Sequence, residues 1–160
     1  MVDLAGVVDR FAAANAPRAA EQGASLAIEV AARPAPVPAD EDQIAQVLQN
    51  LFDNALRYGR SAGSIHVSLR RADNAAGRAG YELAVADDGP GIAPEHLPRL
   101  TERFYRVDKA RSRGTGGTGL GLAIVKHIVN RHRGALRPES EVGRGTTFRV
   151  WLPAEAEPSG

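Results

Sequence analysis

The stretch from Asp40 to Tyr58 reads DEDQIAQVLQNLFDNALRY and has the clearest periodicity in the chain. Its apolar residues recur every three or four positions, which predicts an amphipathic helix with one side on a hydrophobic core. That apolar stripe consists of Ile44, Val47, Leu48, Leu51 and Ala55. The opposite side groups Gln46, Asn50, Asn54 and Arg57 on one face. Such a face is usually solvated, but Asn is a poor helix former and its amide oxygen suits Mg²⁺. The helix alone leaves both interpretations open.

The segments around this helix predict a mixed architecture. Residues 4–20 have helical spacing with Asp3 as N-cap, and residues 119–131 form a further helix ended by Gly134. Strands are predicted at 25–31, 65–70, 81–86, 135–139 and 146–152, with the second and third of these as a hairpin and a Pro-rich connector over 33–38. The expected fold class is α+β: a two-layer α/β sandwich in which a mixed sheet of about five strands packs on three helices.

Composition limits the classes of protein that the chain can represent. The 160 residues are 43% hydrophobic and 24% charged, with a net charge of +1, as expected for one globular domain. We expect that domain to span 1–153, followed by a frayed polar tail over 154–160. The charge balance gives no case for binding nucleic acid or a membrane surface. The absence of cysteine excludes disulfides, thiolate metal sites and Cys nucleophiles.

A second candidate feature is Asp87-Asp-Gly-Pro-Gly91, directly after a predicted strand. Gly89 and Gly91 permit positive φ and close approach of a ligand to the backbone. Asp87, at the strand end, is a candidate acceptor for a ligand donor such as an exocyclic amine. Taken alone, the motif favours a plain turn, because Asp-Gly and Pro-Gly are strong turn dipeptides.

A third feature is the glycine-rich run Gly114-Thr-Gly-Gly-Thr-Gly-Leu-Gly121, which opens a helix. Exposed amides at a helix N-terminus form a phosphate site. No strand precedes the run and no Lys-Ser or Lys-Thr follows it, so the dinucleotide-binding and P-loop interpretations both fail. The preceding stretch, about 92–118, lacks clear periodicity and carries several arginines, as expected for a long lid.

Five ordered motifs give the chain a specific resemblance. It resembles the catalytic, ATP-binding domain of sensor histidine kinases, in the superfamily shared with gyrase, mismatch-repair and heat-shock-chaperone ATPases. The motifs that carry it are similar to the N box (Gln49–Tyr58), the G1 box (Asp87–Ile92), the F box (Arg103–Asp108), the G2 box (Gly117–Leu122) and the final Gly box (Gly143–Phe148). The phrase from Leu100 to Arg113 looks most like the phosphate-regulon sensor kinases, and Thr101 stands where most of the family has Phe.

The resemblance implies roles for individual residues around ATP and Mg²⁺. Asn54 would ligate Mg²⁺ with Asn50 close by, and Arg57 would reach the phosphates. Tyr58 would pack on adenine, Asp87 would accept its amino group with support from Thr146, and Gly89 and Gly91 would shape that loop. In the lid, Arg106 would hold the triphosphate together with the G2 residues Gly117, Gly119, Leu120 and Gly121.

The resemblance also implies an activity and its partners. ATPases of the superfamily have a Glu general base at the position of Asn50, and an amide cannot take a proton, which favours transfer to a protein over hydrolysis. The expected reaction is transfer of the ATP γ-phosphate to a His on a helical dimerisation domain, with a response regulator receiver domain downstream. None of the four histidines has an acceptor motif, so we expect a cytoplasmic fragment of a parent anchored in the inner membrane.

Two alternatives remain at this stage. One is a stand-alone serine kinase of the anti-sigma type, which has the same fold but no dimerisation domain. The other is a pseudokinase that binds nucleotide without catalysis. The long predicted lid disfavours the first, and the presence of all five motifs disfavours the second.

Overall fold

The computed structural model describes residues 1–58, 63–92, 95 and 121–154. Its described helices are α1 (Leu4–Glu21), α2 (Glu41–Tyr58) and α4 (Gly121–Arg131). Its strands are β1 (Val2–Asp3), β2 (Ser25–Val30), β3 (Pro36–Val37), β4 (Ser64–Arg71), β5 (Gly80–Asp87), β6 (Ala135–Glu141) and β7 (Gly145–Pro153). The predicted lid, apart from Ile92 and Glu95, and the predicted tail after Ala154 lie outside the described residues.

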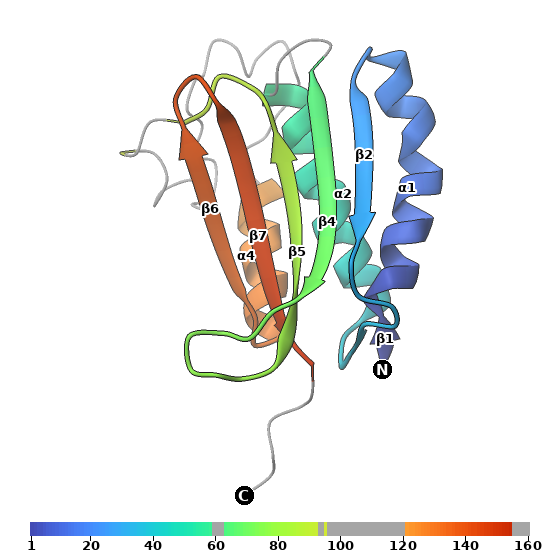
Figure 1. Ribbon diagram of the computed structural model, residues 1–160, viewed down its shortest axis with the longest axis vertical. Helices are drawn as coiled ribbons and strands as arrows, with labels where there is room; N and C mark the ends of the chain where they lie inside the picture. The colour runs from blue at the N-terminus through green and yellow to red at the C-terminus, as the bar shows by residue number, and fades with distance from the viewer. Residues whose placement is uncertain (59–62, 93–94, 96–120, 155–160) are drawn as a thin grey trace, which may run out of the picture.

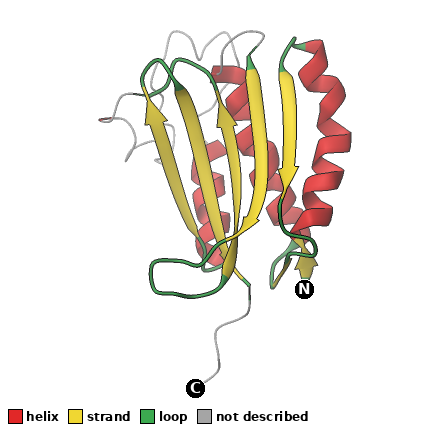
Figure 2. Cartoon of the chain, viewed as in Figure 1, coloured by secondary structure: helices red, strands yellow, loops and turns green. Residues whose placement is uncertain are grey.

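Five strands form one mixed sheet in the order β2-β4-β5-β7-β6. The β2–β4 pair is parallel and the other three pairs are antiparallel, including the predicted β4–β5 hairpin. The three described helices cover one face of this sheet and leave the other face open (Figures 1 and 2). The predicted α+β two-layer sandwich is therefore confirmed.

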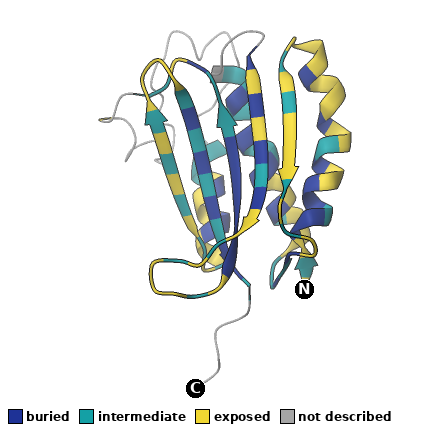
Figure 3. Cartoon of the chain, viewed as in Figure 1, coloured by how far each residue is buried: buried dark blue, intermediate teal, exposed yellow. Residues whose placement is uncertain are grey.

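The core lies between the helices and the covered face of the sheet. The stripe predicted on α2 is buried in full, from Ile44 to Ala55. Phe52 of α2 meets Phe11 of α1 edge to face, with ring centroids 5.2 Å apart. Strands β4 and β7 alternate buried and more exposed residues, as expected when one face of a sheet is covered, whereas β5 is buried along most of its length (Figure 3). The central position of β5 explains this difference.

The N-terminal segment is tied to the domain more firmly than the sequence predicts. The Asp3 carboxylate accepts a hydrogen bond from the amide of Ala5, which confirms its capping role, and another from the amide of Ala35. Val2 and Asp3 pair with Pro36 and Val37 as a small antiparallel sheet. The Pro-rich stretch predicted as a plain connector therefore contains a short strand, which pattern reading misses because two residues carry no periodicity.

The C-terminal end of α4 differs from the prediction in one detail. The left-handed residue is Arg133, with φ of 60°, and not Gly134. The amide of Gly134 donates to the carbonyl of Val129 at 3.0 Å, which closes the helix one residue beyond the left-handed position. Gly134 is needed for another reason: a Cβ there would lie 2.2 Å from the carbonyl oxygen of Trp151. None of the described helices is long and apolar enough to cross a membrane.

Candidate functional site

One end of the sandwich gathers chain segments that are far apart in sequence. The ends of β5 and β6, the start of β7 and the end of α2 lie at this end, and α4 begins beside the middle of α2, where Gly121 contacts Asn50 (Figure 1). These are the segments that carry the described parts of the N, G1, G2 and Gly boxes. The topology therefore brings together motifs that are separate in the sequence.

The α2 side of this site consists of half-buried polar side chains. Asn50, Asn54 and Arg57 are all half-buried, whereas Gln46, about three turns before Arg57, is exposed. The Asn50 side-chain nitrogen lies 3.4 Å from the carbonyl oxygen of Gly121, the first residue of α4. This orientation uses the amide NH₂ group of Asn50 and leaves its oxygen as an acceptor.

The neighbouring polar residues of α2 turn toward another helix. Gln49 donates to the side-chain oxygens of Asn15 and Asp53, both at 3.0 Å, and Asp53 is paired with Arg18 of α1. These contacts hold α1 and α2 together. The polar positions of the N box thus divide into residues that join two helices and residues that face the start of α4.

The start of α4 has space beside it within the described part of the chain. A Cβ on Gly121 would meet no heavy atom of the described residues within 4 Å. The first amides of a helix have no partner within the helix and carry a positive partial charge. An anionic group beside Gly121 and Asn50 would therefore be stabilised.

Asp87 supplies a carboxylate at the end of β5. Burial raises the pKa of Asp87 above its ordinary value, and the nearby Asp88 acts in the same direction. The amides of Gly89, at 2.8 Å, and Thr146 donate to this carboxyl group and oppose the rise. Asp88 has a different role, because its carboxylate accepts the amide of Ser64 at the start of β4. The amides of Gly89 and Thr146 thus fix the Asp87 carboxylate in place as a hydrogen-bond acceptor, whereas the Asp88 carboxylate caps the start of β4.

The loop after Asp87 packs directly on the β6–β7 turn. Gly91 has φ of 78°, and a Cβ there would lie 2.3 Å from the carbonyl oxygen of Glu141. Gly145 has φ of 128°, and its Cβ would lie 2.0 Å from the carbonyl oxygen of Asp87. The amide of Gly143 donates to the carbonyl of Pro90 at 2.7 Å. The Asp-Gly-Pro-Gly segment is therefore more than a turn: it is docked against a second glycine-rich turn.

Sequence reasoning missed Ser140. Its hydroxyl lies within hydrogen-bond distance of the Ile92 amide, the Gly145 carbonyl and the Thr146 hydroxyl. Thr146 itself, which was predicted, is buried. A polar residue three positions before Gly143, on a strand of alternating burial, was the only sequence signal available for Ser140.

The described members of the predicted set fall into two groups that the structure connects internally. Asn50 contacts Gly121, and Asp87 contacts Gly89 and Thr146. Asn54 and Arg57 follow Asn50 on α2, and Gly91 follows Gly89 in the loop after β5. Arg106, Gly117, Gly119, Leu120 and the side chain of Tyr58 lie outside the described residues. Of the two glycines in the G1 loop, Gly91 has the positive φ, and Gly89 contributes its amide to Asp87.

The described histidines occupy structural or surface positions. His66 lies in β4 and pairs with Glu29 at 3.3 Å, and His127 lies within α4. His132 is 2.8 Å from the carbonyl of Ile128 through Nδ1 and accepts the Asp40 amide through Nε2. The contacts described for His66 and His132 are with residues other than Asp87 and Asn54.

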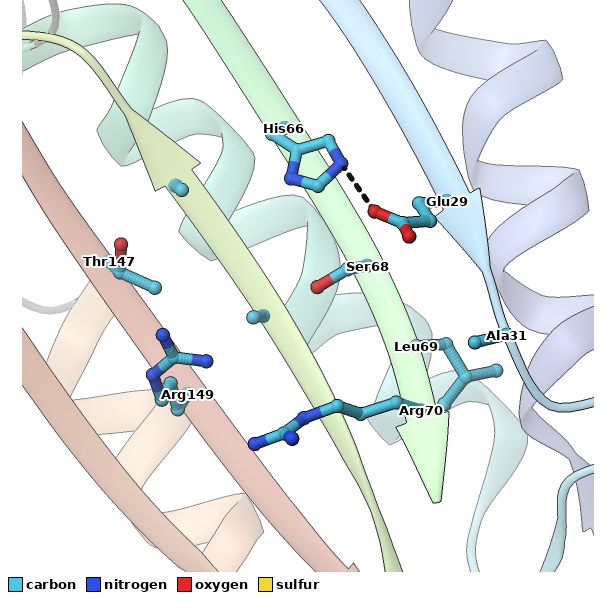
Figure 4. Close-up of a pocket in the computed structure, with 10 residues that line it drawn as sticks. Glu29, Ala31, His66, Ser68, Leu69, Arg70, Thr147 and Arg149 are labelled. Atoms are coloured by element: carbon cyan, nitrogen blue, oxygen red, sulfur yellow. Dashed lines mark ion pairs between the residues drawn. The ribbon is translucent and has the colours of Figure 1, made fainter. Parts of the chain in front are cut away.

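The open face of the sheet carries a separate groove of about 310 Å³ (Figure 4). Ala84 and Ala86 of β5 line it together with longer side chains from β2, β4 and β7, among them His66, Arg70 and Arg149. Arg70 and Arg149 both pair with Glu82, whose side chain is 5% exposed. The lining includes none of the predicted nucleotide-binding residues.

The two-layer fold, the Asp87 carboxylate and the side-chain amides of Asn50 and Asn54 on α2 are together typical of a catalytic ATP-binding domain of the histidine kinase class. Comparison with known proteins supports this class. The chain belongs to the family of histidine kinase-, DNA gyrase B- and HSP90-like ATPases, whose pattern matches residues 39–156. ATP binding follows from membership of this family of ATPases.

Individual relatives narrow the class. The chain is 48% identical over 118 residues to the sensor-like histidine kinase SenX3 of Mycobacterium tuberculosis, covering 74% of this chain and 28% of that protein. It is 44% identical over 143 residues to the phosphate regulon sensor protein PhoR of Pseudomonas aeruginosa, covering 88% of this chain and 31% of that protein. The chain thus spans less than a third of these relatives, which are both sensor kinases.

Solved structures share the whole fold. The mycobacterial sensor histidine kinase MprB matches with a TM-score of 0.78 and 31% identity, over 95% of both chains. Full-length ShkA in complex with AMPPNP matches with a TM-score of 0.78 and 33% identity, over 95% of this chain and 30% of that one. The resemblance inferred from the five motifs is confirmed.

Proposed function

We propose that this domain binds Mg²⁺-ATP at the end of the sandwich and transfers the γ-phosphoryl group to a histidine on the dimerisation domain of a parent sensor kinase. The observation that carries the proposal is the convergence of two unlike groups. A half-buried carboxylate, Asp87, stands on the sheet side, and two amide side chains, Asn50 and Asn54, stand on the helix side, with Asn50 in contact with Gly121 at the start of α4.

Asp87 and Thr146 are the proposed base-reading pair. A carboxylate has about four lone-pair positions. Two amides occupy part of this capacity in Asp87, and the rest accepts the amino group of adenine. Gly89 and Gly91 hold the loop that presents the carboxylate, and Tyr58 packs on the base. A carbonyl at the same position of the base, as in guanine, would face another acceptor.

The phosphate side combines neutral ligands with cations. The donor set fits Mg²⁺, because amide oxygens are hard neutral ligands and the ion needs few protein ligands when phosphates supply the others. Asn54 and Asn50 would hold the ion, which neutralises charge on the phosphates when bound. Arg57, the lid residue Arg106, and the backbone of Gly117, Gly119, Leu120 and Gly121 bind the phosphate oxygens.

The acceptor is a protein side chain outside this chain. Asn50 cannot remove a proton from water, so it cannot act as the general base of hydrolysis. In the transfer, the bond from the γ-phosphorus to the ADP oxygen breaks and a bond to an imidazole nitrogen forms. The proposed partners are the helical dimerisation domain and then the receiver domain of a response regulator. The proposed location is the cytoplasmic side of an inner membrane in which the parent is anchored.

The test combines binding and transfer. Calorimetry should show ATP binding that requires Mg²⁺. Incubation with γ-labelled ATP should leave the chain alone unlabelled, because no acceptor is held in line near the phosphate, and positioning is worth about 7–11 kcal/mol of the barrier. Adding the parent dimerisation domain should produce slow, acid-labile label on that domain.

Each alternative predicts a different result. A stand-alone serine kinase would give acid-stable label on a protein substrate, and a pseudokinase would bind ATP and transfer nothing. Acid-labile label on the isolated chain would show that one of its own histidines is an acceptor, and the proposal would then be wrong.

A further inference from the structure

The hydroxyl of Ser140 is held in a fully determined arrangement of hydrogen bonds. The amide of Ile92 donates to Ser140 Oγ at 2.7 Å. The carbonyl of Gly145 lies 2.9 Å from the same atom and can only accept, so the Ser140 proton points to Gly145. The third neighbour, Thr146 Oγ1, lies at 2.8 Å.

These contacts determine which hydroxyl donates in the Ser140–Thr146 pair. A serine hydroxyl has one proton and two lone pairs. Its proton is used by Gly145 and one lone pair by Ile92, so the remaining position is a lone pair that accepts the Thr146 proton. Thr146 therefore has no proton to give elsewhere, and its own two lone pairs are the only hydrogen-bonding capacity that its hydroxyl can offer.

From this we infer that Ser140 is a specificity-determining positioning residue, which makes Thr146 an obligate acceptor beside Asp87 and thereby selects a nucleobase edge that donates. The inference rests on the proposed function and extends it. Asp87 is also an acceptor, and the Thr146 amide donates to it, so the two groups act side by side. An amino group on the base, or a water that the amino group holds, satisfies both acceptors. A carbonyl on the base satisfies neither.

Ser140 also links this selection to the G1 loop. Its contact with the Ile92 amide joins β6 to the residue that follows Gly91, and its contact with Gly145 joins β6 to the start of β7. The same hydroxyl thus sets the polarity of Thr146 and the position of the backbone around it. A purely structural role would affect all nucleotides equally, whereas control of polarity affects them unequally.

The experiment compares ATP with inosine triphosphate, which has a 6-carbonyl in place of the 6-amino group and a proton on N1, and with purine riboside triphosphate, which lacks the amino group and keeps N1 unprotonated. Affinities are measured by calorimetry with Mg²⁺ on the 160-residue chain. In Ser140→Ala the Thr146 hydroxyl no longer donates to Ser140, so it can donate to the 6-carbonyl of the base instead. The preference for ATP over inosine triphosphate should narrow by about fivefold to tenfold, the effect of one hydrogen bond.

Three variants control this result. Ser140→Thr keeps the hydroxyl and should restore the preference. Ser68→Ala removes a half-buried strand serine on the open face of the sheet and should leave both affinities unchanged. In a Thr146→Val background, which has no Thr hydroxyl, adding Ser140→Ala should change the preference no further. If Ser140→Ala does not fold, Ser140→Cys, with a weaker donor and acceptor, should narrow the preference in the same direction.

The outcomes distinguish ATP binding by the chain from the role of Ser140 in base selection. If the wild-type chain binds no ATP, the proposed function fails. If the wild-type chain prefers ATP and Ser140→Ala weakens both nucleotides by the same factor, or changes neither, the proposed function stands and the role assigned to Ser140 is wrong.

Discussion

Gly145 lies against the backbone of Asp87, so close that a Cβ on Gly145 would be 2.0 Å from the Asp87 carbonyl oxygen. Asp87 on β5 lies opposite Thr146 on β7, and Gly145 is the residue just before Thr146. This contact joins the end of β5 to the turn that starts β7. The carboxylate proposed to read the base is therefore held in position by a glycine in a different motif.

Gly145→Ala should destabilise the fold and weaken ATP binding. The backbone of Gly145, with φ of 128°, is unfavourable for any residue with a side chain, which costs about 1–3 kcal/mol. The clash with Asp87 adds to this cost. Urea unfolding measures the first effect and calorimetry the second.

Gly143→Ala and Gly77→Ala are the matched controls. Both glycines have positive φ, of 87° and 81°, but a Cβ on either would meet no heavy atom of the described residues within 4 Å. They carry the backbone strain without the clash, so each should cost less than Gly145→Ala. Equal losses in all three would show that contact with Asp87 contributes nothing.

Asn54→Ala should abolish Mg²⁺-dependent ATP binding and leave the fold intact. Asn54 lies on the polar face of α2 away from the buried stripe, and Ala is the better helix former, so the free energy of unfolding should change by less than about 0.5 kcal/mol. Gln46→Ala, on the exposed part of the same face, should retain full affinity. Unchanged Mg²⁺-ATP affinity in Asn54→Ala would remove Asn54 from the site.

Asp87→Asn should narrow the preference for ATP over GTP, because the variant can donate to the guanine carbonyl as well as accept. An unmade buried hydrogen bond costs about 1–3 kcal/mol, which corresponds to about tenfold to a hundredfold in affinity. Competition binding with both nucleotides measures the gap. A wild-type chain that binds GTP as tightly as ATP would show that Asp87 does not read the base.

The affinity for ATP should also depend on pH through Asp87. Its pKa in the folded chain is raised above the ordinary value of 3.8, so the ionised acceptor forms only as the pH rises through the raised value. Affinity should therefore increase with pH in that window. Stability changes in the opposite direction there, because the unfolded chain releases this proton first. Asp87→Asn should lack both effects, and calorimetry with urea unfolding across the window measures them.

Glu82→Gln should destabilise the sheet. Although burial opposes ionisation of Glu82, hydrogen bonds from Arg70 and Arg149 outweigh it and hold the pKa of the carboxyl below its ordinary value. Its removal leaves two arginines that reach solvent in part, so we expect a loss of about 1–3 kcal/mol at neutral pH. Glu139→Gln, which removes an exposed partner of Arg149, should cost about 0–1 kcal/mol.

The contribution of Glu82 should disappear in acid. A depressed pKa means that the ionised form stabilises the fold above pH 4.5 and that this stabilisation is lost as the pH falls through the lower, folded-state value. The difference in unfolding free energy between wild type and Glu82→Gln should therefore shrink as the pH falls below 4.5. A difference that stays constant with pH would assign the effect to packing alone.

Periodicity in the sequence determined the elements and the faces of this domain. The buried stripe of α2, the alternation in β4 and β7, the cap at Asp3 and the two-layer class all follow from spacing within one segment. The motifs determined the family in the same way, because residues such as Asn54, Asp87 and Thr146 stand at set distances along the chain. Local geometry repeats every two or 3.6 residues, so a single strand or helix carries its own signal.

Only the tertiary structure decided which of these segments meet. Nothing in the spacing shows that Gly145 lies on Asp87, that Ser140 uses all of its hydrogen-bonding capacity, that Glu82 is buried between two arginines, or that β1 pairs with β3. These relations depend on strand order, register and the approach of one backbone to another. Contacts among the described residues join positions up to 92 apart, as between His132 and Asp40, and no local period extends over such distances. The chain encodes such contacts only through the packing of the whole core.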